Sequence, residues 1–247
     1  MWRYTGLKNL LRLAKTRFAT AFIALSSIYK QQDNLRKMFV SDDWTSSKWA
    51  KGQAGKKAAQ SVLTYSFWVG IIYALKVTGP LIRVLRLVDG EKKPAMGYIY
   101  EAMDQATIAA SFNDSEKHKY ESIYSIIDKR WDCQLHRPLH AAGYYLNPEF
   151  YYNDLVAMER DKEVNRDLIK CIERLVPSIQ MQDMIMRELP LYQNSDTESL
   201  FESAMAVRHR KTEAPAEWWK SFEAETPNLQ QFAIKVLSLT CSSSGCE

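Results

Sequence analysis

Glycine and proline are scarce in this chain. Its 247 residues include 9 glycines and 8 prolines, about 7% together, against a usual ~12% in globular proteins. Tight turns depend on these two residues, so their scarcity disfavours folds built from many short strands. Because 46% of the residues are hydrophobic, the chain can still bury a sizeable core, which excludes a disordered protein. Long helices are the expected structure.

Long apolar runs are lacking as well. The uncharged stretch from Ala58 to Leu75 has 18 residues and only reaches the lower limit for a membrane span. It contains Gln60 and Thr64 among other polar residues, so we interpret it as a buried helix and expect no membrane partner. The four cysteines have no regular spacing, and no secretory signal is recognisable, which favours a reducing compartment.

Motifs for nucleotide binding and hydrolysis are absent: the sequence has no P-loop, dinucleotide fingerprint or Gly-x-Ser-x-Gly elbow. A weaker pattern is Cys133, His136 and His140, spaced C-x-x-H-x-x-x-H, with Cys171 as a distant fourth zinc ligand. Pro138 separates the two histidines and no paired C-x-x-C is present, so packing is the favoured interpretation. We therefore predict no metal ion and no cofactor.

Basic charge is unevenly distributed along the chain. There are 33 basic and 29 acidic residues, a formal charge of +4, yet the first 32 residues hold six basic residues and no acidic one. Residues 33–247 therefore sum to −2. An acid-free, arginine-containing N-terminus is typical of an organelle transit peptide. Apolar residues at helical spacing in the same segment favour a folded helix instead.

Helical spacing continues along the chain. Apolar residues three and four apart predict a series of helices. These cover residues 7–30 and about 47–78, 94–110, 120–131 and 158–176. Pro80 is expected to end the second of them. Residues 193–197 form the most polar gap, so we predict one region over 1–192 and another over 193–247, in an all-α fold.

The last section carries the strongest helical pattern. Pro215 begins a predicted helix that contains Trp218 and Trp219, and Glu217 suits the positive end of its dipole. Five apolar residues of the next segment have the spacing of one helix face, namely Leu229, Phe232, Ala233, Val236 and Leu237. The chain ends soon afterwards at Glu247, which we interpret as truncation of a longer protein.

Four stretches of this sequence resemble the hAT superfamily of transposase-like proteins of plants. They are TRFAT (16–20); RLVDG (86–90) with KPAMGYIY (93–100); RWD (130–132) with LHRPLHAAGY (135–144) and LNP (146–148); and PAEWW (215–219) with SSGCE (243–247). They lie in the family's order and extend over essentially the whole chain. The resemblance implies the helical insertion domain of an RNase H-like transposase and a partial C-terminal dimerisation region, with the sheet core largely missing.

The same resemblance bears on catalysis. In that family a BED-type zinc finger binds DNA, and three carboxylates hold two divalent metal ions for strand cleavage. Glu247 matches the third carboxylate, whereas the finger and the first two carboxylates have no counterpart here. Two-metal catalysis needs several convergent carboxylates. We therefore expect a catalytically incomplete protein that is not an enzyme, with divalent metal implied only for a complete family member.

Dimerisation is the first positive function that the resemblance implies. Trp218, Trp219 and the apolar face from Leu229 to Leu237 resemble the family's dimerisation element, in which such side chains are buried against a partner. The partner would be a second copy or a related hAT protein. Packing of the same side chains inside the chain is an equally good explanation.

DNA binding by the basic N-terminal helix is the runner-up. Arg17 and Phe18 resemble an arginine-aromatic pair that lies near transposon-end DNA in the family, and Arg12 and Lys15 add positive charge. With a formal charge of only +4, such binding is expected to be weak, salt-sensitive and non-specific. A helical fragment with no retained role is the third alternative. The expected location is the nucleus, with the cytoplasm as the alternative.

Overall fold

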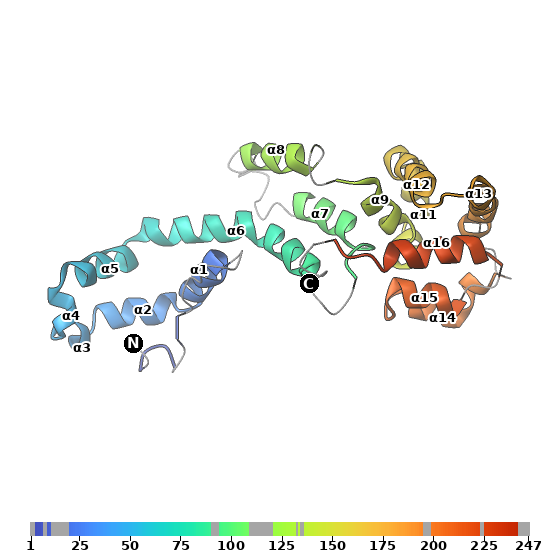
Figure 1. The fold of residues 1–247 in the computed structure, drawn as a ribbon. Coiled ribbons are helices and arrows are strands. Elements are labelled where there is room, and N and C mark those ends of the chain that lie inside the picture. Colours follow the sequence, from blue (N-terminus) through green and yellow to red (C-terminus); the bar gives the residue numbers. More distant parts are fainter. Residues whose placement is uncertain are drawn as a thin grey trace. The chain divides into compact units, whose positions relative to one another are not determined.

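The regular structure of this protein is helical (Figure 1). The computed structural model describes residues 3–6, 9–10, 20–89, 94–108, 121–131, 133, 136–194, 199–222 and 225–241. The described part of the chain contains no strand. The predicted all-α class is confirmed.

Short connections join most of the helices. The first six are α1 (Thr20–Lys30), α2 (Gln32–Phe39), α3 (Asp42–Thr45), α4 (Lys48–Lys51), α5 (Gln53–Leu63) and α6 (Tyr65–Val88). The middle of the chain contributes α7 (Ile99–Ile108), α8 (Glu121–Arg130), α9 (Pro138–Tyr145), α10 (Pro148–Tyr151), α11 (Leu155–Arg160), α12 (Lys162–Leu175) and α13 (Ile179–Gln193). The last elements are the 3-10 helix η3 (Leu200–Glu202), α14 (Ala204–His209), α15 (Pro215–Phe222) and α16 (Pro227–Leu237).

The chain divides into two compact units. Unit 1 comprises residues 1–82 and 109–120, and unit 2 comprises residues 83–108 and 121–247. The division falls within α6, and the elements from η3 to α16 belong to the same unit as α9 and α13. The sequence division at residue 193 is thus not a division between compact units. As a boundary between a helical insertion-type region and a partial C-terminal dimerisation region it stays a prediction.

Serine and aspartate side chains start several of these helices. Ser41 Oγ accepts a hydrogen bond from the backbone N–H of Trp44 at 3.3 Å, and Ser47 Oγ accepts one from Ala50 at 3.3 Å. The Asp161 carboxylate accepts two backbone N–H bonds in the first turn of α12. Such caps satisfy N–H groups that have no partner within their own helix. They explain why α3 and α4 form as separate short helices.

The segment predicted as one helix over 47–78 forms three helices. Gly52 and Thr64 adopt extended backbone conformations, with ψ of 148° and 130°, and each ends a helix. Thr64 thereby divides the uncharged stretch from Ala58 to Leu75 between α5 and α6. None of the described helices combines the length and the apolar character that crossing a membrane requires.

Pro80 does not end a helix, and that prediction was wrong. It lies inside α6, which continues to Val88. A proline within a helix removes one N–H bond and costs about 3 kcal/mol or more. Buried apolar residues on both sides of Pro80, Ile71 before it and Val84 after it, supply packing that offsets this cost.

Unit 1 is centred on a small apolar core. Its buried members are Leu35, Met38, Val62, Trp68 and Ile71, contributed by α2, α5 and α6. Trp68 is only 1% exposed, and its indole Nε1 donates a 2.7 Å hydrogen bond to the carbonyl oxygen of Val62 near the end of α5. A buried indole needs such an acceptor. The bond therefore links the end of α5 to the start of α6.

Helix α9 lies at the centre of unit 2. It packs against α7, α10, α12 and α16, and Ala141, Ala142 and Tyr145 are 0% exposed. At Gly143 the helix comes so close to another segment that a Cβ atom would lie 2.5 Å from the carbonyl oxygen of Met96. A helix that is buried on most of its circumference needs small residues where another backbone approaches it.

The residues that follow α9 are held by three hydrogen bonds. Asn147 Nδ2 donates to the carbonyl oxygen of Gly97 at 2.9 Å, and Asn147 Oδ1 accepts from the backbone N–H of Glu149 at 3.1 Å. Trp219 Nε1 donates to the carbonyl oxygen of Leu146 at 2.8 Å. The Asn147 and Trp219 side chains are 0% exposed, so leaving either of them without its acceptor would cost about 1–3 kcal/mol. The bonds tie α7, α9 and α15 together.

Replacing Gly143 with alanine should destabilise unit 2. Alanine is favoured in a helix by about 1 kcal/mol, but its Cβ would clash with the Met96 carbonyl, and relief of such crowding costs about 1–3 kcal/mol. We expect a lower thermal midpoint for Gly143→Ala, measured by circular dichroism. Gly70→Ala is the control, because no atom lies within 4 Å of a Cβ at Gly70. A Gly143→Ala midpoint equal to the wild-type value would contradict the close approach.

Candidate functional site

The seven predicted dimerisation residues all lie in the core of unit 2. They are Trp218, Trp219, Leu229, Phe232, Ala233, Val236 and Leu237, with exposed fractions between 0% and 3%. Helices α15 and α16 pack on each other, and α16 also packs on α9 and α13. Packing inside the chain, the alternative interpretation, therefore accounts for these side chains. Their role in a dimer interface stays a prediction.

Aromatic rings join this C-terminal segment to the rest of unit 2. Trp218 stacks on Phe201 with ring centroids 5.5 Å apart, and its Nε1 donates to the carbonyl oxygen of Ala206 at 2.9 Å. Trp219 lies 4.9 Å from the ring of Tyr192 on α13. The two adjacent tryptophans thus fix η3 and α14 on one side and α13 on the other.

Glu188 of α13 caps the start of α16. Its carboxylate accepts a 2.7 Å hydrogen bond from the backbone N–H of Leu229 and a second bond from the side chain of Asn228. Thr226, the residue before α16, supplies no side-chain cap. A carboxylate at the positive end of a helix is stabilising. Spacing along the sequence could not reveal this cap, because the two helices are far apart in the chain.

Three large apolar side chains remain exposed in η3 and α14. Leu200 is 42% exposed, Met205 55% and Val207 42%. On α14, Met205 and Val207 flank Ala206, which is fully buried. We call these three side chains the η3–α14 surface. Met205 and Val207 are two residues apart, so they lie on the two flanks of α14, on either side of the buried Ala206. Single exposed apolar residues are ordinary; these three are candidate contact residues because they follow one another in one short segment.

Four predicted DNA-contacting residues, Arg12, Lys15, Arg17 and Phe18, lie outside the described residues. The basic excess, however, extends well beyond the first 32 positions. Residues 1–82 hold 13 basic and 3 acidic residues, a formal +10, whereas residues 83–247 hold 20 basic and 26 acidic residues, a formal −6. Residues 109–120 carry two of each sign, so the change of sign coincides with the division between units 1 and 2.

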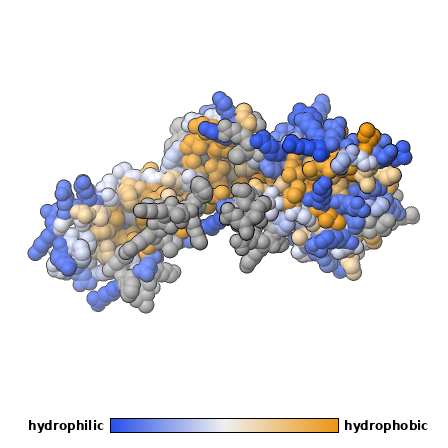
Figure 2. Space-filling model, viewed as in Figure 1, coloured by the Kyte–Doolittle hydropathy of each residue, from blue (hydrophilic) through white to orange (hydrophobic). Residues whose placement is uncertain are grey.

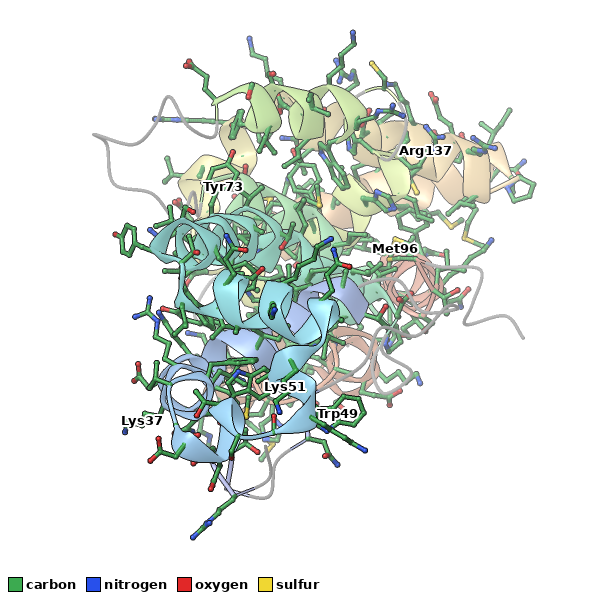
Figure 3. The ribbon with its side chains drawn as sticks, turned by 90° about the vertical axis from the view of Figure 1, so that its left-hand side faces the viewer. Lys37, Trp49, Lys51, Tyr73, Met96 and Arg137 are labelled. Atoms are coloured by element: carbon green, nitrogen blue, oxygen red, sulfur yellow. The ribbon has the colours of Figure 1, made fainter. Side chains whose placement is uncertain are left out.

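Unit 1 also presents an exposed aromatic ring among its lysines. Trp49 on α4 is 65% exposed, and the Nζ of Lys48 lies 5.0 Å from its ring centroid. Lys51, Lys56 and Lys57 are exposed nearby along the chain, and residues 44–88 contain no acidic residue. Figure 3 shows Trp49 and Lys51 on the outside of this part of unit 1. The surface over α4 and α5 is largely hydrophilic (left, Figure 2).

The cysteines and histidines considered as zinc ligands do not form one group. Cys133 is exposed, whereas Cys171 is buried, and burial raises the pKa of the Cys171 thiol to about 11. His140 stacks on Trp131 with ring centroids 5.7 Å apart. Burial, together with the neighbouring His136 and an adjacent arginine, lowers the pKa of His140 to about 4, so its ring is neutral at physiological pH.

His136 instead lies beside two carboxylates of α12. One nitrogen of His136 and one oxygen each of Glu163 and Asp167 lie within 4.8 Å of one another. His136 Nδ1 is 3.4 Å from Glu163 Oε1, and His136 Nε2 is 3.7 Å from Asp167 Oδ2. The carboxylates stand four residues apart, which places them on one helix face. A pattern limited to residues 133–140 could not reveal them.

More acidic and aromatic residues surround this group. Burial raises the pKa of Asp104, with Glu101 and Asp161 adding to the effect. Burial also raises the pKa of Tyr100 above its ordinary value, and nearby carboxylates, Asp161 first, add to that shift. Glu247, the residue that the resemblance aligns with a catalytic carboxylate, lies outside the described residues.

Comparison with known proteins bears on the C-terminal segment. A search of curated proteins and a search of solved structures each found no match to the chain. In a comparison with protein families, residues 194–247 match the model described as the hAT family C-terminal dimerisation region. The matched segment includes η3, α14, α15 and α16. Over these residues the chain is similar to the part of hAT proteins that is named for dimerisation, and this supports a dimerisation role.

Proposed function

We propose that this chain is a hAT transposase-derived protein that self-associates, with a second copy or a related hAT protein as its partner, through the η3–α14 surface. The family match over residues 194–247 is the observation that carries the proposal. Within that segment the tryptophans and the α16 face are buried, so the contact must be made by side chains that remain outside. Among the described residues of the segment, the exposed large apolar side chains are Leu200, Met205, Val207 and Leu239, and the first three lie on η3 and α14.

The η3–α14 surface is firmly supported from beneath. The bond from Trp218 to the Ala206 carbonyl anchors α14, and Arg210 forms an ion pair with Glu202 of η3. The Arg210 guanidinium also lies 3.8 Å from the ring centroid of Tyr152. A rigid support lowers the entropy that is lost when a surface binds. The flexible side chain of Met205 adapts readily to a partner's shape.

Charge placed on this surface should separate the dimer without unfolding the chain. In the double variant Met205→Glu plus Val207→Glu, both substituted side chains are exposed in the single chain, so folding should be preserved. Burying a carboxylate against a partner costs more than about 1.4 kcal/mol, which corresponds to at least a tenfold weaker association. Light scattering coupled to size exclusion, over a range of concentrations, measures this change.

Ile126→Glu is the matched control. Ile126 is 60% exposed on α8 of the same unit and lies outside the matched segment. It should leave the association constant unchanged. If the double variant dimerises as tightly as the wild type, the η3–α14 surface is not the interface; if Ile126→Glu alone dissociates the dimer, the interface lies over α8.

Nucleic-acid binding by unit 1 is the second candidate function. It is favoured by the formal +10 of residues 1–82 and by Trp49, an exposed ring beside lysines of an acid-free segment. Lysines neutralise phosphates without reading sequence, and an exposed indole can stack on an unpaired base. The expected ligand is therefore single-stranded DNA or RNA bound without sequence preference. A nuclear location is proposed with this activity, and a cytoplasmic one remains the alternative.

Two variants separate stacking from charge. Trp49→Ala should weaken binding of a labelled single strand by about 1–3 kcal/mol and leave the salt dependence unchanged. Lys56→Ala plus Lys57→Ala should reduce the slope of log affinity against log salt by about 1.4, since each phosphate contact contributes ~0.7 for single strands. Fluorescence anisotropy over a salt series gives both quantities.

Lys220→Ala serves as the control for this titration, because Lys220 is an exposed lysine of unit 2 that pairs with Glu217. It should leave affinity and slope unchanged. Arg12→Ala plus Arg17→Ala, the pair predicted from the N-terminal segment, shows how far that segment contributes. Equal binding by the wild type, Trp49→Ala and the double lysine variant would remove α4 and α5 from the interface.

Strand cleavage is not part of the proposed function. The single carboxylate that the resemblance aligns with the catalytic triad, Glu247, could not by itself hold two divalent ions. Pure protein incubated with DNA and Mg²⁺ is therefore expected to leave the DNA intact on a denaturing gel. Cleavage that depends on Mg²⁺ and is lost in Glu247→Gln would overturn this expectation.

A further inference from the structure

One nitrogen of the His136 ring is buried and has no hydrogen-bond partner. The His136 side chain is 10% exposed, and Nε2 is that nitrogen. The nearest carboxylate oxygen, Asp167 Oδ2, lies 3.7 Å away, beyond hydrogen-bond range. A buried nitrogen without a partner costs about 1–3 kcal/mol. An occupant between His136 and Asp167 would remove that cost.

Neighbouring cations orient the Asp167 carboxylate. Lys170 Nζ lies 2.9 Å from Oδ1, and Arg166 Nε lies 3.5 Å from the same oxygen. Both basic groups thus contact Oδ1, while Oδ2 faces His136. The Asp167 side chain is only 5% exposed. Outer contacts of this kind fix a ligand's orientation in metal sites.

Aromatic packing fixes the histidine as well. The His136 ring stacks on Trp131 with centroids 5.5 Å apart and an interplanar angle of 22°, and Tyr100 meets it edge-on at 5.6 Å. His136 lies just before α9, and α9 packs closely on α12. His136 and Asp167 are therefore held in place within unit 2, and the half-exposed Glu163 lies one helical turn before Asp167 on α12.

We propose that His136, Glu163 and Asp167 form a binding site for one zinc-class divalent ion, which would clamp the start of α9 to α12. Each residue supplies one ligand atom, and these atoms lie within 4.8 Å of one another, so small side-chain shifts would bring them to coordination distance. One imidazole and two carboxylates form a donor set that suits Zn²⁺. Water would complete the coordination, since the Glu163 side chain is 48% exposed.

This ligand set differs from the one that the sequence pattern offers. The pattern C-x-x-H-x-x-x-H proposes Cys133 and His140 beside His136. In the structure His140 packs against Trp131, and Cys133 is not among the convergent ligands. The structure replaces these residues with two carboxylates from α12. The two sets can be distinguished because only one of them contains a thiolate.

Metal binding to the full chain, first stripped with a chelator, tests the site. Titration with Zn²⁺ against a chromophoric competitor should show one equivalent bound by the wild type. Glu163→Gln should weaken that binding at least about tenfold, since loss of even an outer-shell partner typically weakens binding 10–100-fold. Glu163 is half-exposed, so this variant should fold normally. Zn²⁺ should also raise the thermal midpoint of the wild type more than that of Glu163→Gln.

Two controls and a second metal decide between the ligand sets. His209→Gln removes a histidine that pairs with a single carboxylate, Glu213, at 2.7 Å, and Cys133→Ser removes the thiol; both should bind Zn²⁺ like the wild type. With Co²⁺ the wild type should show weak visible bands and no thiolate charge-transfer band. The proposal is overturned if Glu163→Gln binds Zn²⁺ as tightly as the wild type, if Cys133→Ser abolishes binding, or if no equivalent is bound. In the last case His136 and its carboxylates form an ion-pair cluster only.

Discussion

The close approach between α9 and the Met96 backbone is the constraint on which unit 2 depends. Gly143 permits it because a Cβ there would lie 2.5 Å from the Met96 carbonyl oxygen. Once α9 lies this deep, Asn147 reaches the Gly97 carbonyl and Trp219 reaches the Leu146 carbonyl. These bonds fix the start of α7 and helix α15 relative to α9. Helix α12 then packs on α9, and this packing brings its carboxylates to His136.

The same packing determines which side chains are left for partners. The tryptophans and the apolar face of α16 are used to complete the core, so a contact surface has to come from what lies outside them. Leu200, Met205 and Val207 remain exposed on η3 and α14, held by Trp218 and by the Arg210 contacts. The buried aromatic residues of the core therefore position the exposed side chains that we propose as the interface.

Part of this organisation could be predicted from the sequence. Helical spacing and the scarcity of glycine and proline predicted the all-α class, and the spacing of Leu229 to Leu237 identified one helix face that is indeed buried. The spacing could not tell whether that face met another chain or its own, because amphipathicity records burial and not the identity of what covers it. The helix was predicted to end at Pro80, but it continues, because buried residues before and after the proline outweigh its low helix propensity. The carboxylates beside His136 were missed because only the packing of α9 on α12 brings them there.

Self-association is the central claim, and sedimentation equilibrium of the unmodified chain tests it most directly. The chain has a mass of 28.6 kDa. The account predicts an apparent mass near the monomer value at the lowest loading concentrations. At higher concentrations the apparent mass should rise toward twice the monomer mass. It also predicts that data at several rotor speeds fit a single monomer–dimer equilibrium. An apparent mass that stays at the monomer value over the whole concentration range would contradict it.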